Sequence, residues 1–115
     1  MKVEEMEVFK LSHSFTIEIY KITKDYPKEE IYSLISQMRR SALSISMNLS
    51  DWYYRYNNKE FKHFINIARG SAGELKYQLL ISLDLSYITV GTYNNLNEKI
   101  ETILKMLTNL IKSIN

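Results

Sequence analysis

Hydrophobic residues recur at alternating spacings of three and four along most of this chain, which is the pattern of amphipathic helices. The clearest run lies near the C-terminus and forms one face of a helix of about six turns. Its members are Tyr93, Leu96, Ile100, Ile103, Leu107, Leu110 and Ile114. Thr89 precedes the run as an N-cap, and Gly91 falls in the first turn, where its entropic cost is smallest. The pattern predicts a helix over residues 89–114.

The segment before this run carries the same pattern and predicts a helix over residues 58–86. Its apolar seam, widened by Phe64 and Leu83, comprises Phe61, Ile65, Ala68, Ala72, Leu75, Leu79 and Ser82. Asn57 and Glu60 stand three residues apart at its start. They form an Asn variant of the capping box, in which each side chain accepts a hydrogen bond from the other's backbone N–H.

Two further seams predict two more helices. The helix over residues 28–54 has the seam Ile31, Leu34, Met38, Ala42, Ile45, Leu49 and Trp52. Pro27 and the acidic residues after it suit a first helical turn, and Ser33 is an alternative cap. The helix over residues 9–25 has the seam Val8, Leu11, Phe15, Ile19, Ile22 and Tyr26.

The connections between these helices are only a few residues long, so consecutive helices must reverse direction. Three glycines and one proline leave few places to turn, which disfavours a sheet with many hairpins. A chain of 115 residues suits one domain. The sequence therefore predicts an all-α, antiparallel up-down-up-down four-helix bundle that occupies residues 1–115 as a single domain.

Composition narrows the class of protein. Hydrophobic residues make up 45% and charged residues 24%, the balance of a globular chain, and the absence of cysteine excludes disulfides and thiolate chemistry. No stretch approaches the roughly 20 apolar residues that span a bilayer. Glu4, Glu5 and Glu7 give the N-terminus the wrong charge for a signal peptide. We expect a cytoplasmic protein without membrane contact.

The candidate chemistry is sparse. Glu60 and His63 form a Glu-x-x-His pair, but a di-iron carboxylate bundle needs a second pair, and His13 has no acid at the right offset. The serines of residues 36–50 lack a nucleophile elbow, and no phosphate-binding glycine loop is present. The interpretation is that the chain is not an enzyme and has no catalytic residue, metal site or cofactor.

Gly70 and Gly73 lie inside the helix expected over residues 58–86, where each costs roughly 1 kcal/mol relative to alanine. Such a cost needs a compensating reason. The interpretation we favour is a close helix crossing at Gly70, Ser71 and Gly73. The alternative is a contact surface for a partner.

Charge is concentrated in the middle of the chain. Residues 31–80 hold seven basic and three acidic side chains, a net charge of +4, whereas the whole chain carries +2. The seven are candidates for phosphate contacts: Arg39, Arg40, Arg55, Lys59, Lys62, Arg69 and Lys76. Trp52, Tyr53, Tyr54 and Tyr56 could stack on bases near them. A plain solvated surface explains the charge equally well, and Arg39 and Arg40 have the alternative of pairing with Glu74 inside the bundle.

A series of motifs in the same region points to a family. They are Ser36-Gln37-Met38-Arg39-Arg40-Ser41-Ala42, Ser44-Ile45-Ser46-Met47-Asn48, Glu60-Phe61, Ile67-Ala68-Arg69-Gly70-Ser71 and Glu74-Leu75. The sequence resembles the four-helix-bundle family first seen as proteins encoded in intervening sequences of 23S ribosomal RNA genes. That family also includes the accessory variability determinant of diversity-generating retroelements. The likeness runs from Val8 to Ile111.

The resemblance implies a bundle that assembles into a homopentameric ring, binds nucleic acid and, in the retroelement branch, contacts a reverse transcriptase. It implies no enzyme activity. The sequence departs from the family's usual pattern at Ser46, where proline is common, and at Asp51-Trp52, where Glu-Gly is common. The first departure predicts a more regular helix, and the second puts bulk into the turn.

The apolar side chains also predict self-association. Four short seams cannot cover Trp52, Tyr53, Tyr54 and Tyr56 together with Met47 and Leu43, and exposed apolar patches usually mark an interface. The functional hypothesis is a non-catalytic homo-oligomer that binds structured RNA or DNA through the region from Arg39 to Lys76. The alternative is a structural or protein-binding module without nucleic-acid contact.

Overall fold

The computed structural model describes residues 2–55 and 58–114, and all regular structure in these residues is helical. The four long helices are α1 (Glu7–Thr23), α2 (Leu34–Tyr54), α3 (His63–Asp84) and α4 (Val90–Ile114). Three short 3-10 helices precede α1, α2 and α3: η1 (Val3–Glu5), η2 (Lys28–Glu30) and η3 (Lys59–Phe61). The predicted all-α, four-helix fold is confirmed.

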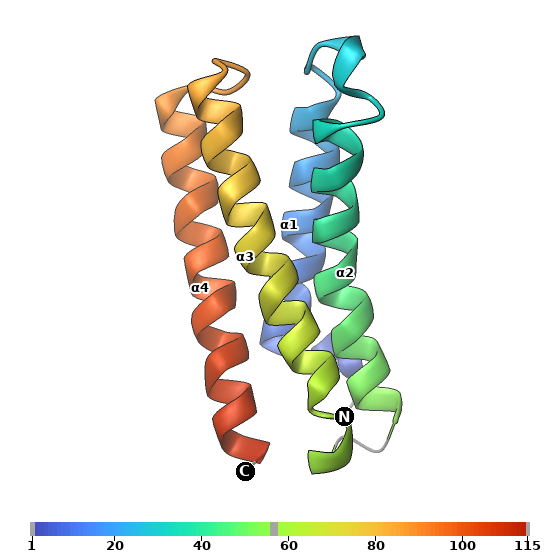
Figure 1. Cartoon of the computed structure of the whole chain (residues 1–115). Coiled ribbons are helices and arrows are strands. Elements are labelled where there is room, and N and C mark those ends of the chain that lie inside the picture. Colours follow the sequence, from blue (N-terminus) through green and yellow to red (C-terminus); the bar gives the residue numbers. More distant parts are fainter. Residues whose placement is uncertain (1, 56–57, 115) are drawn as a thin grey trace.

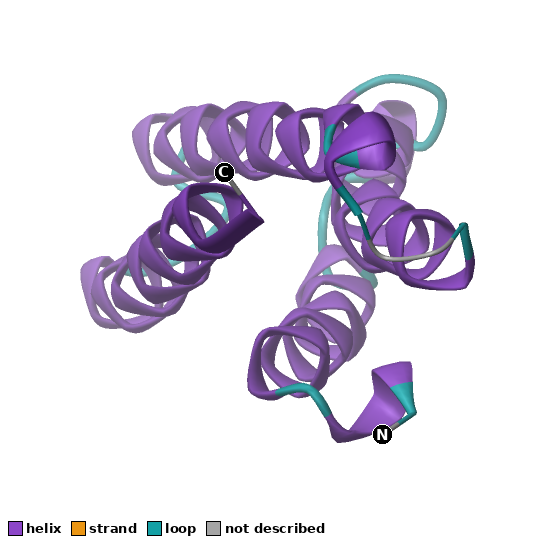
Figure 2. Ribbon diagram, turned by 90° about the horizontal axis from the view of Figure 1, so that it is seen from below, coloured by secondary structure: helices purple, strands orange, loops and turns teal. Residues whose placement is uncertain are grey.

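Successive helices run in opposite directions and pack side by side, with α1 beside α2 and α3 beside α4 (Figure 1). Both ends of the chain lie at the same end of the bundle as the α2–α3 connection (Figure 1). Figure 2 looks at the bundle from that end. The most extensive packing joins α2 to α3, and the weakest neighbouring contact joins α1 to α4. The molecule measures 42 × 25 × 20 Å.

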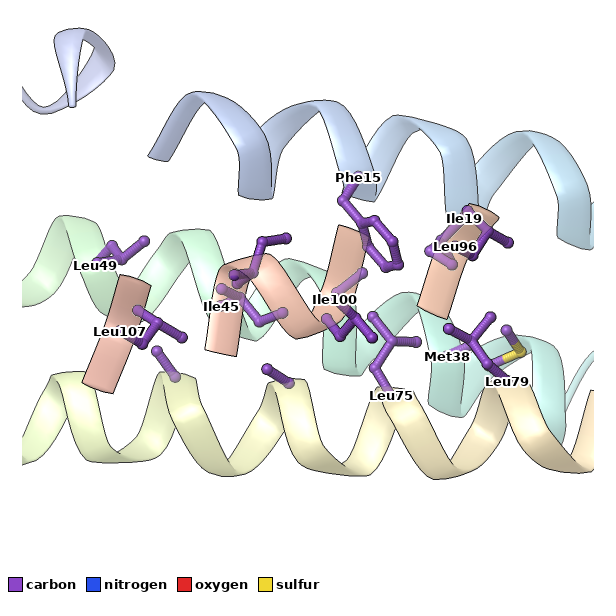
Figure 3. Close-up of a cluster of buried hydrophobic side chains, with 14 of the residues drawn as sticks. Phe15, Ile19, Met38, Ile45, Leu49, Leu75, Leu79, Leu96, Ile100 and Leu107 are labelled. Atoms are coloured by element: carbon purple, nitrogen blue, oxygen red, sulfur yellow. The ribbon is translucent and has the colours of Figure 1, made fainter. Parts of the chain in front are cut away.

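The core lies along the axis of the bundle, where side chains from all four helices meet (Figure 3). Phe15 and Ile19 of α1 point into the interior, where they lie near Ile100 and Leu96, and Met38 of α2 lies near Leu79 of α3 (Figure 3). The fully buried members of the seams of α3 and α4 are Ile65, Ala68, Ala72, Leu75, Leu79, Leu96, Ile100, Ile103 and Leu107. The predicted seams are therefore correct at their centres. Leu11 and Ile31 were assigned to seams but are exposed.

α2 begins at Leu34, so the start predicted at residue 28 is wrong and the boundary at Ser33 is right. The backbone of Ser33 leaves the helical region, with φ −127° and ψ −101°. Its hydroxyl donates to the Glu30 carboxylate at 2.5 Å instead of capping the helix. The same carboxylate accepts a hydrogen bond of 2.7 Å from the Tyr87 hydroxyl. These contacts hold η2 against the α3–α4 connection and separate it from α2.

The connections show how the other helices begin. The Asn58 side chain accepts from the Glu60 backbone N–H at 3.0 Å and caps η3, while Asn57, assigned to the capping box, lies outside the described residues. The predicted cap of α4 is confirmed, because Thr89 Oγ1 accepts from the Thr92 backbone N–H at 3.1 Å. α2 runs unbroken through Ser46, as expected for a chain without proline there.

Small polar side chains join neighbouring helices at their closest points. Thr16 Oγ1 of α1 donates to the Ala42 carbonyl of α2 at 3.2 Å, and Ser71 Oγ of α3 donates to Ser44 Oγ of α2 at 2.7 Å. Serine and threonine add little bulk between helices, so these bonds form across short gaps.

The close crossing expected at Gly70 and Gly73 is wrong. A methyl group at either position would meet no atom within 4 Å outside the local backbone of α3, so neither glycine is needed for packing inside this chain. Only Ser71 of that group faces α2, because it is one residue from Gly70 and two from Gly73 and therefore points in a different direction from both.

Candidate nucleic-acid interface

The structure separates the seven candidate cations into three places. Arg39 and Arg40 lie on α2, Arg55 and Lys59 lie at the end of the bundle that carries both termini, and Lys62, Arg69 and Lys76 lie along α3. No single surface contains all seven. Each group is therefore considered by its own contacts.

Arg39 links α2 to α1. Its Nε donates to Thr23 Oγ1 at 3.0 Å and its Nη2 donates to the Tyr20 carbonyl at 3.4 Å. The guanidinium also lies 4.7 Å from the centre of the Tyr20 ring, within cation–π range. Glu74 forms no ion pair with any residue that the structure describes, so the alternative of Arg39 or Arg40 pairing with Glu74 within one chain is wrong. Arg39 has a structural role.

Arg40 and Arg55 lie in different surroundings from Arg39. Arg40 is exposed on the outward face of α2, beside Leu43 and Met47. Arg55 ends α2, and its guanidinium lies 5.4 Å from the centre of the Phe64 ring. The contacts of the α3 cations at positions 69 and 76 are instead with α4.

The α3 cations follow one edge of the helix. Lys62, Arg69 and Lys76 are spaced by seven residues, about two helical turns, which places them in line. Arg69 Nη1 donates to Thr108 Oγ1 of α4 at 3.5 Å, and Lys76 forms an ion pair with Glu101 of α4. Arg69 and Lys76 therefore lie on the edge of α3 that borders α4.

α4 adds two cations that the sequence reasoning missed. Lys105 and Lys112 are exposed and line a shallow groove of about 880 Å³ that also contains Thr108, the hydrogen-bond partner of Arg69. They were missed because residues 81–115 have no net charge. The sequence signal that could have found them is their spacing of seven residues, which is also the spacing of the α3 cations. This spacing places each pair or row on one side of its helix, and the two rows lie on adjoining edges.

We call these five cations the α3–α4 band: Lys62, Arg69, Lys76, Lys105 and Lys112. Glu98 and Glu101 are the carboxylates on the same side of α4, which leaves a net charge of +3. The side chains of Lys76 and Glu101 retain 42% and 49% of their exposure, so solvent weakens their pairing and the ammonium group stays accessible. Such a surface suits phosphate groups, which need cations that water can reach.

Lys59 lies at one end of this band. It lines a hollow of about 490 Å³ with Asn58, Trp52 and Ser113 at the point where η3 meets the last turn of α4. The lysine is exposed. The cationic surface thus continues to the end of the bundle that carries both termini.

The expectation that the aromatic turn stacks on bases is wrong for Trp52. The indole is only 3% exposed and belongs to the core, because the seam of α2 continues to that residue. Tyr53 is half-buried, Tyr54 is exposed with its ring edge-on to that of Tyr53, and Tyr56 lies outside the described residues. Only Tyr54 among the described members offers an open ring.

The remaining candidate features are a metal site, a membrane span and side chains with shifted pKa values. Glu60 and His63 are exposed, and no group of three potential metal-binding side chains occurs among residues 2–55 and 58–114. Within the same residues, no helix is long and apolar enough to cross a bilayer. The clearest shifts in pKa lie elsewhere, at the contact between η2 and the α3–α4 connection. There the hydrogen bond to Glu30 raises the pKa of Tyr87 to about 12.

Comparison with known proteins agrees with this architecture. The sequence pattern of the 23S rRNA-intervening sequence proteins matches residues 4–109. The chain belongs to this family. A similar solved structure is a protein of unknown function from the S23 ribosomal protein family of Bacteroides thetaiotaomicron VPI-5482, with 28% identity and a TM-score of 0.83. The match covers 91% of this chain and 95% of that one. No curated protein matches.

The sequence motifs that resemble the 23S rRNA-intervening sequence protein family can be located on the fold. The motif over residues 36–42 forms the first two turns of α2 and contains Arg39, which joins α1 to α2. The motif over residues 67–71 lies in α3 and contains Arg69 of the band and Ser71 of the α2 contact. The motifs thus combine helix-joining residues with two accessible cations, Arg40 and Arg69.

Proposed function

We propose that this protein is a non-catalytic, homo-oligomeric accessory protein of the cytoplasm that binds structured RNA or DNA through the α3–α4 band. The observation that carries the proposal is the alignment of cations from two helices along one accessible side of the bundle, with a net charge of +3. The rows are parallel to the bundle axis, so they can follow a phosphate backbone. No helix presents a base-reading arrangement, so binding depends on phosphates rather than sequence.

Assembly strengthens such an interface. A homo-oligomer repeats the band in every copy, so a modest charge per chain becomes a strong field per assembly. The family resemblance supports five copies and, in the retroelement branch, a reverse transcriptase as the protein partner.

The test compares two triple variants that carry equal charge. Arg69→Glu with Lys105→Glu and Lys112→Glu reverses the accessible part of the band. Lys21→Glu with Lys24→Glu and Lys28→Glu, the matched control, reverses three exposed lysines of α1 and η2. Either set replaces three positive charges by three negative ones and takes the net charge from +2 to −4. Lys76 is left unchanged because a glutamate there would repel Glu101.

Binding is measured by fluorescence anisotropy with a labelled RNA hairpin and a DNA duplex over a range of salt concentrations. Wild-type affinity should fall steeply with salt, because each neutralised phosphate releases counterions. The band variant should lose affinity at least tenfold more than the control, with unchanged thermal melting. Equal losses in both variants, or a flat salt dependence in wild type, would contradict the proposal.

A second candidate function is a structural or protein-binding module without nucleic-acid contact. The exposed apolar side chains on the outward faces of α2 and α3 favour it, since such patches mark protein interfaces. Absence of any binding to RNA or DNA at low salt would leave this function in place of the first.

A further inference from the structure

The outward face of α3 is built for contact but touches nothing in this chain. Gly70 and Gly73 lie on it, and a methyl group at either position would meet no atom within 4 Å. Ile67 and Tyr77 flank them with 47% and 63% of their surface exposed. Glycine inside a helix weakens it and allows a close approach of another backbone. Apolar groups on both sides of the glycines extend that contact surface.

The outward face of α2 is also open, and it carries apolar side chains along a groove. Leu43 and Met47 are exposed there, and they line a shallow groove of about 590 Å³ that also contains Ile31 and Arg40. Arg40 has no hydrogen bond or ion pair to any residue that the structure describes. Its guanidinium is therefore a charged group next to uncovered apolar side chains.

The charges of the two faces are complementary. The exposed positions of α3 carry Glu74, one residue after Gly73, and Asp84 near the helix end, while the exposed Arg69 lies on the edge toward α4. The α2 face carries Arg40 among its apolar residues, with Asp51 one turn beyond Met47. The charge beside the glycines of α3 is thus negative at Glu74, and the charge beside Leu43 and Met47 of α2 is positive at Arg40. Contact between unlike faces joins opposite charges.

We propose that the outward face of α3 in one copy docks on the outward face of α2 in the next copy, with Glu74 against Arg40. This inference rests on the homo-oligomer of the proposed function and identifies its interface. A two-fold dimer would make this contact twice, with α3 of each copy on α2 of the other. A contact made once per pair of copies leaves one face free in each and continues into a ring or a filament.

The contact is compatible with the α3–α4 band. Arg69 and Lys76 lie on the edge of α3 that borders α4, whereas Gly70 and Gly73 are open to solvent and Glu74 is exposed beside them. Each helix is roughly 30 Å long, which gives enough length for an interface of ordinary size. One assembly can therefore join copies and present the band at once.

The first part of the test exchanges charges across the interface, with mass measured by light scattering. Arg40→Glu and Glu74→Arg should each reduce the assembly, because each places like charges together. The double variant should restore the wild-type mass, since the pair is re-formed in reverse. Glu98→Arg on α4 is the matched control and should leave the mass unchanged.

The second part tests the glycines. Gly70→Leu should dissociate the assembly while each chain keeps its helicity by circular dichroism, because leucine favours a helix and its Cβ meets no atom within 4 Å outside the local backbone of α3. An assembly that keeps its mass in Gly70→Leu and in both single charge variants would overturn the inference and leave the proposed oligomer intact. Failure of the double variant to restore the mass would overturn the Arg40–Glu74 pairing. A monomeric wild type would overturn both the inference and the oligomer.

Discussion

Ser86 adopts a backbone conformation that glycine normally occupies. Its φ is +62°, and it is the one non-glycine residue with positive φ in the described part of the chain. The Tyr87 N–H donates to the Ser82 carbonyl at 2.8 Å, and the Ser86 N–H donates to the Leu83 carbonyl at 2.9 Å. These two bonds form a Schellman motif that ends α3. The helix end therefore stores strain at one side chain.

Ser86→Gly should raise the free energy of unfolding by about 0.5–1 kcal/mol, because it removes the strain of a Cβ in the left-handed region. Ser86→Ala is the matched control. It removes the hydroxyl but keeps the Cβ, so it should give no gain. Urea unfolding measures both, and equal stabilities of the two variants would show that the strain is absent.

Tyr87 and Glu30 predict opposite pH dependences. The hydrogen bond to Glu30 raises the pKa of Tyr87 from 10.0 to about 12, so its contribution to stability is complete below pH 10 and lost as the pH rises toward 12. Hydrogen bonds from Ser33 and then Tyr87 lower the pKa of Glu30, so its contribution is present at neutral pH and lost in acid. Tyr87→Phe should remove the alkaline limb of stability against pH and reduce the acid limb only in part, because the Ser33 hydrogen bond to Glu30 remains; urea unfolding measures both. Unchanged limbs would contradict the contact.

Substitutions in the core should reduce stability more strongly. Leu75→Asp or Ile103→Asp places a carboxylate without a partner at a fully buried position and should lower stability by more than about 3 kcal/mol. Asn66→Asp adds the same charge at an exposed position of α3 and should change it little. Circular dichroism and thermal melting measure all three. Full helicity with a cooperative melt in both core variants would disprove the assigned seams.

The burial of single residues can be predicted where the helical spacing alone decides it. Ile65, Leu75 and Ile103 follow directly from the three-four spacing. Arg39 does not, because its partners on α1 are distant in sequence and a charged side chain carries no signal of them. Trp52 fitted the seam of α2 and also the aromatic turn, and only the three-dimensional packing shows that the seam prevails.

At the scale of the helices, the pattern gave the number, type and order of elements. The early start assigned to α2 shows its limit, because Pro27 and the acidic residues after it suit a helical turn as well as a 3-10 turn. The chain forms the 3-10 turn, and in that turn Glu30 accepts a hydrogen bond from Tyr87, a residue distant in sequence. The glycines of α3 show the same limit, since a pattern cannot tell an internal crossing from an open face.

The α2–α3 contact predicts a coupling between two serines. Ser44→Ala and Ser71→Ala each remove the 2.7 Å hydrogen bond, and a double-mutant cycle should give a coupling of about 0.5–1.5 kcal/mol. Ser41→Ala on the same helix, paired with Ser71→Ala, is the control and should give nearly additive effects. Additivity in the first cycle would mean that the bond does not contribute to α2–α3 packing.

At the scale of the whole molecule, the sequence found the cations but not their arrangement. A count along the chain marked residues 31–80 as basic, which included Arg39 although its donors bond to α1. The same count excluded Lys105 and Lys112, which adjoin Arg69 through Thr108. The packing of the helices decides which charged side chains share a face, and a count over a sequence segment does not show this. The α3–α4 band is therefore a property of the fold.

The most direct test of that band is lysine footprinting of the wild-type protein, with and without an RNA hairpin, read by mass spectrometry of acetylated lysines. On adding RNA at low salt, Lys105 and Lys112 should become protected, with Lys59 at the end of the band. Lys21, Lys24 and Lys28 should keep their reactivity. Protection of the α1 and η2 lysines instead, or no protection at Lys105 and Lys112 while RNA is bound, would contradict the central claim that this protein binds nucleic acid through the α3–α4 band.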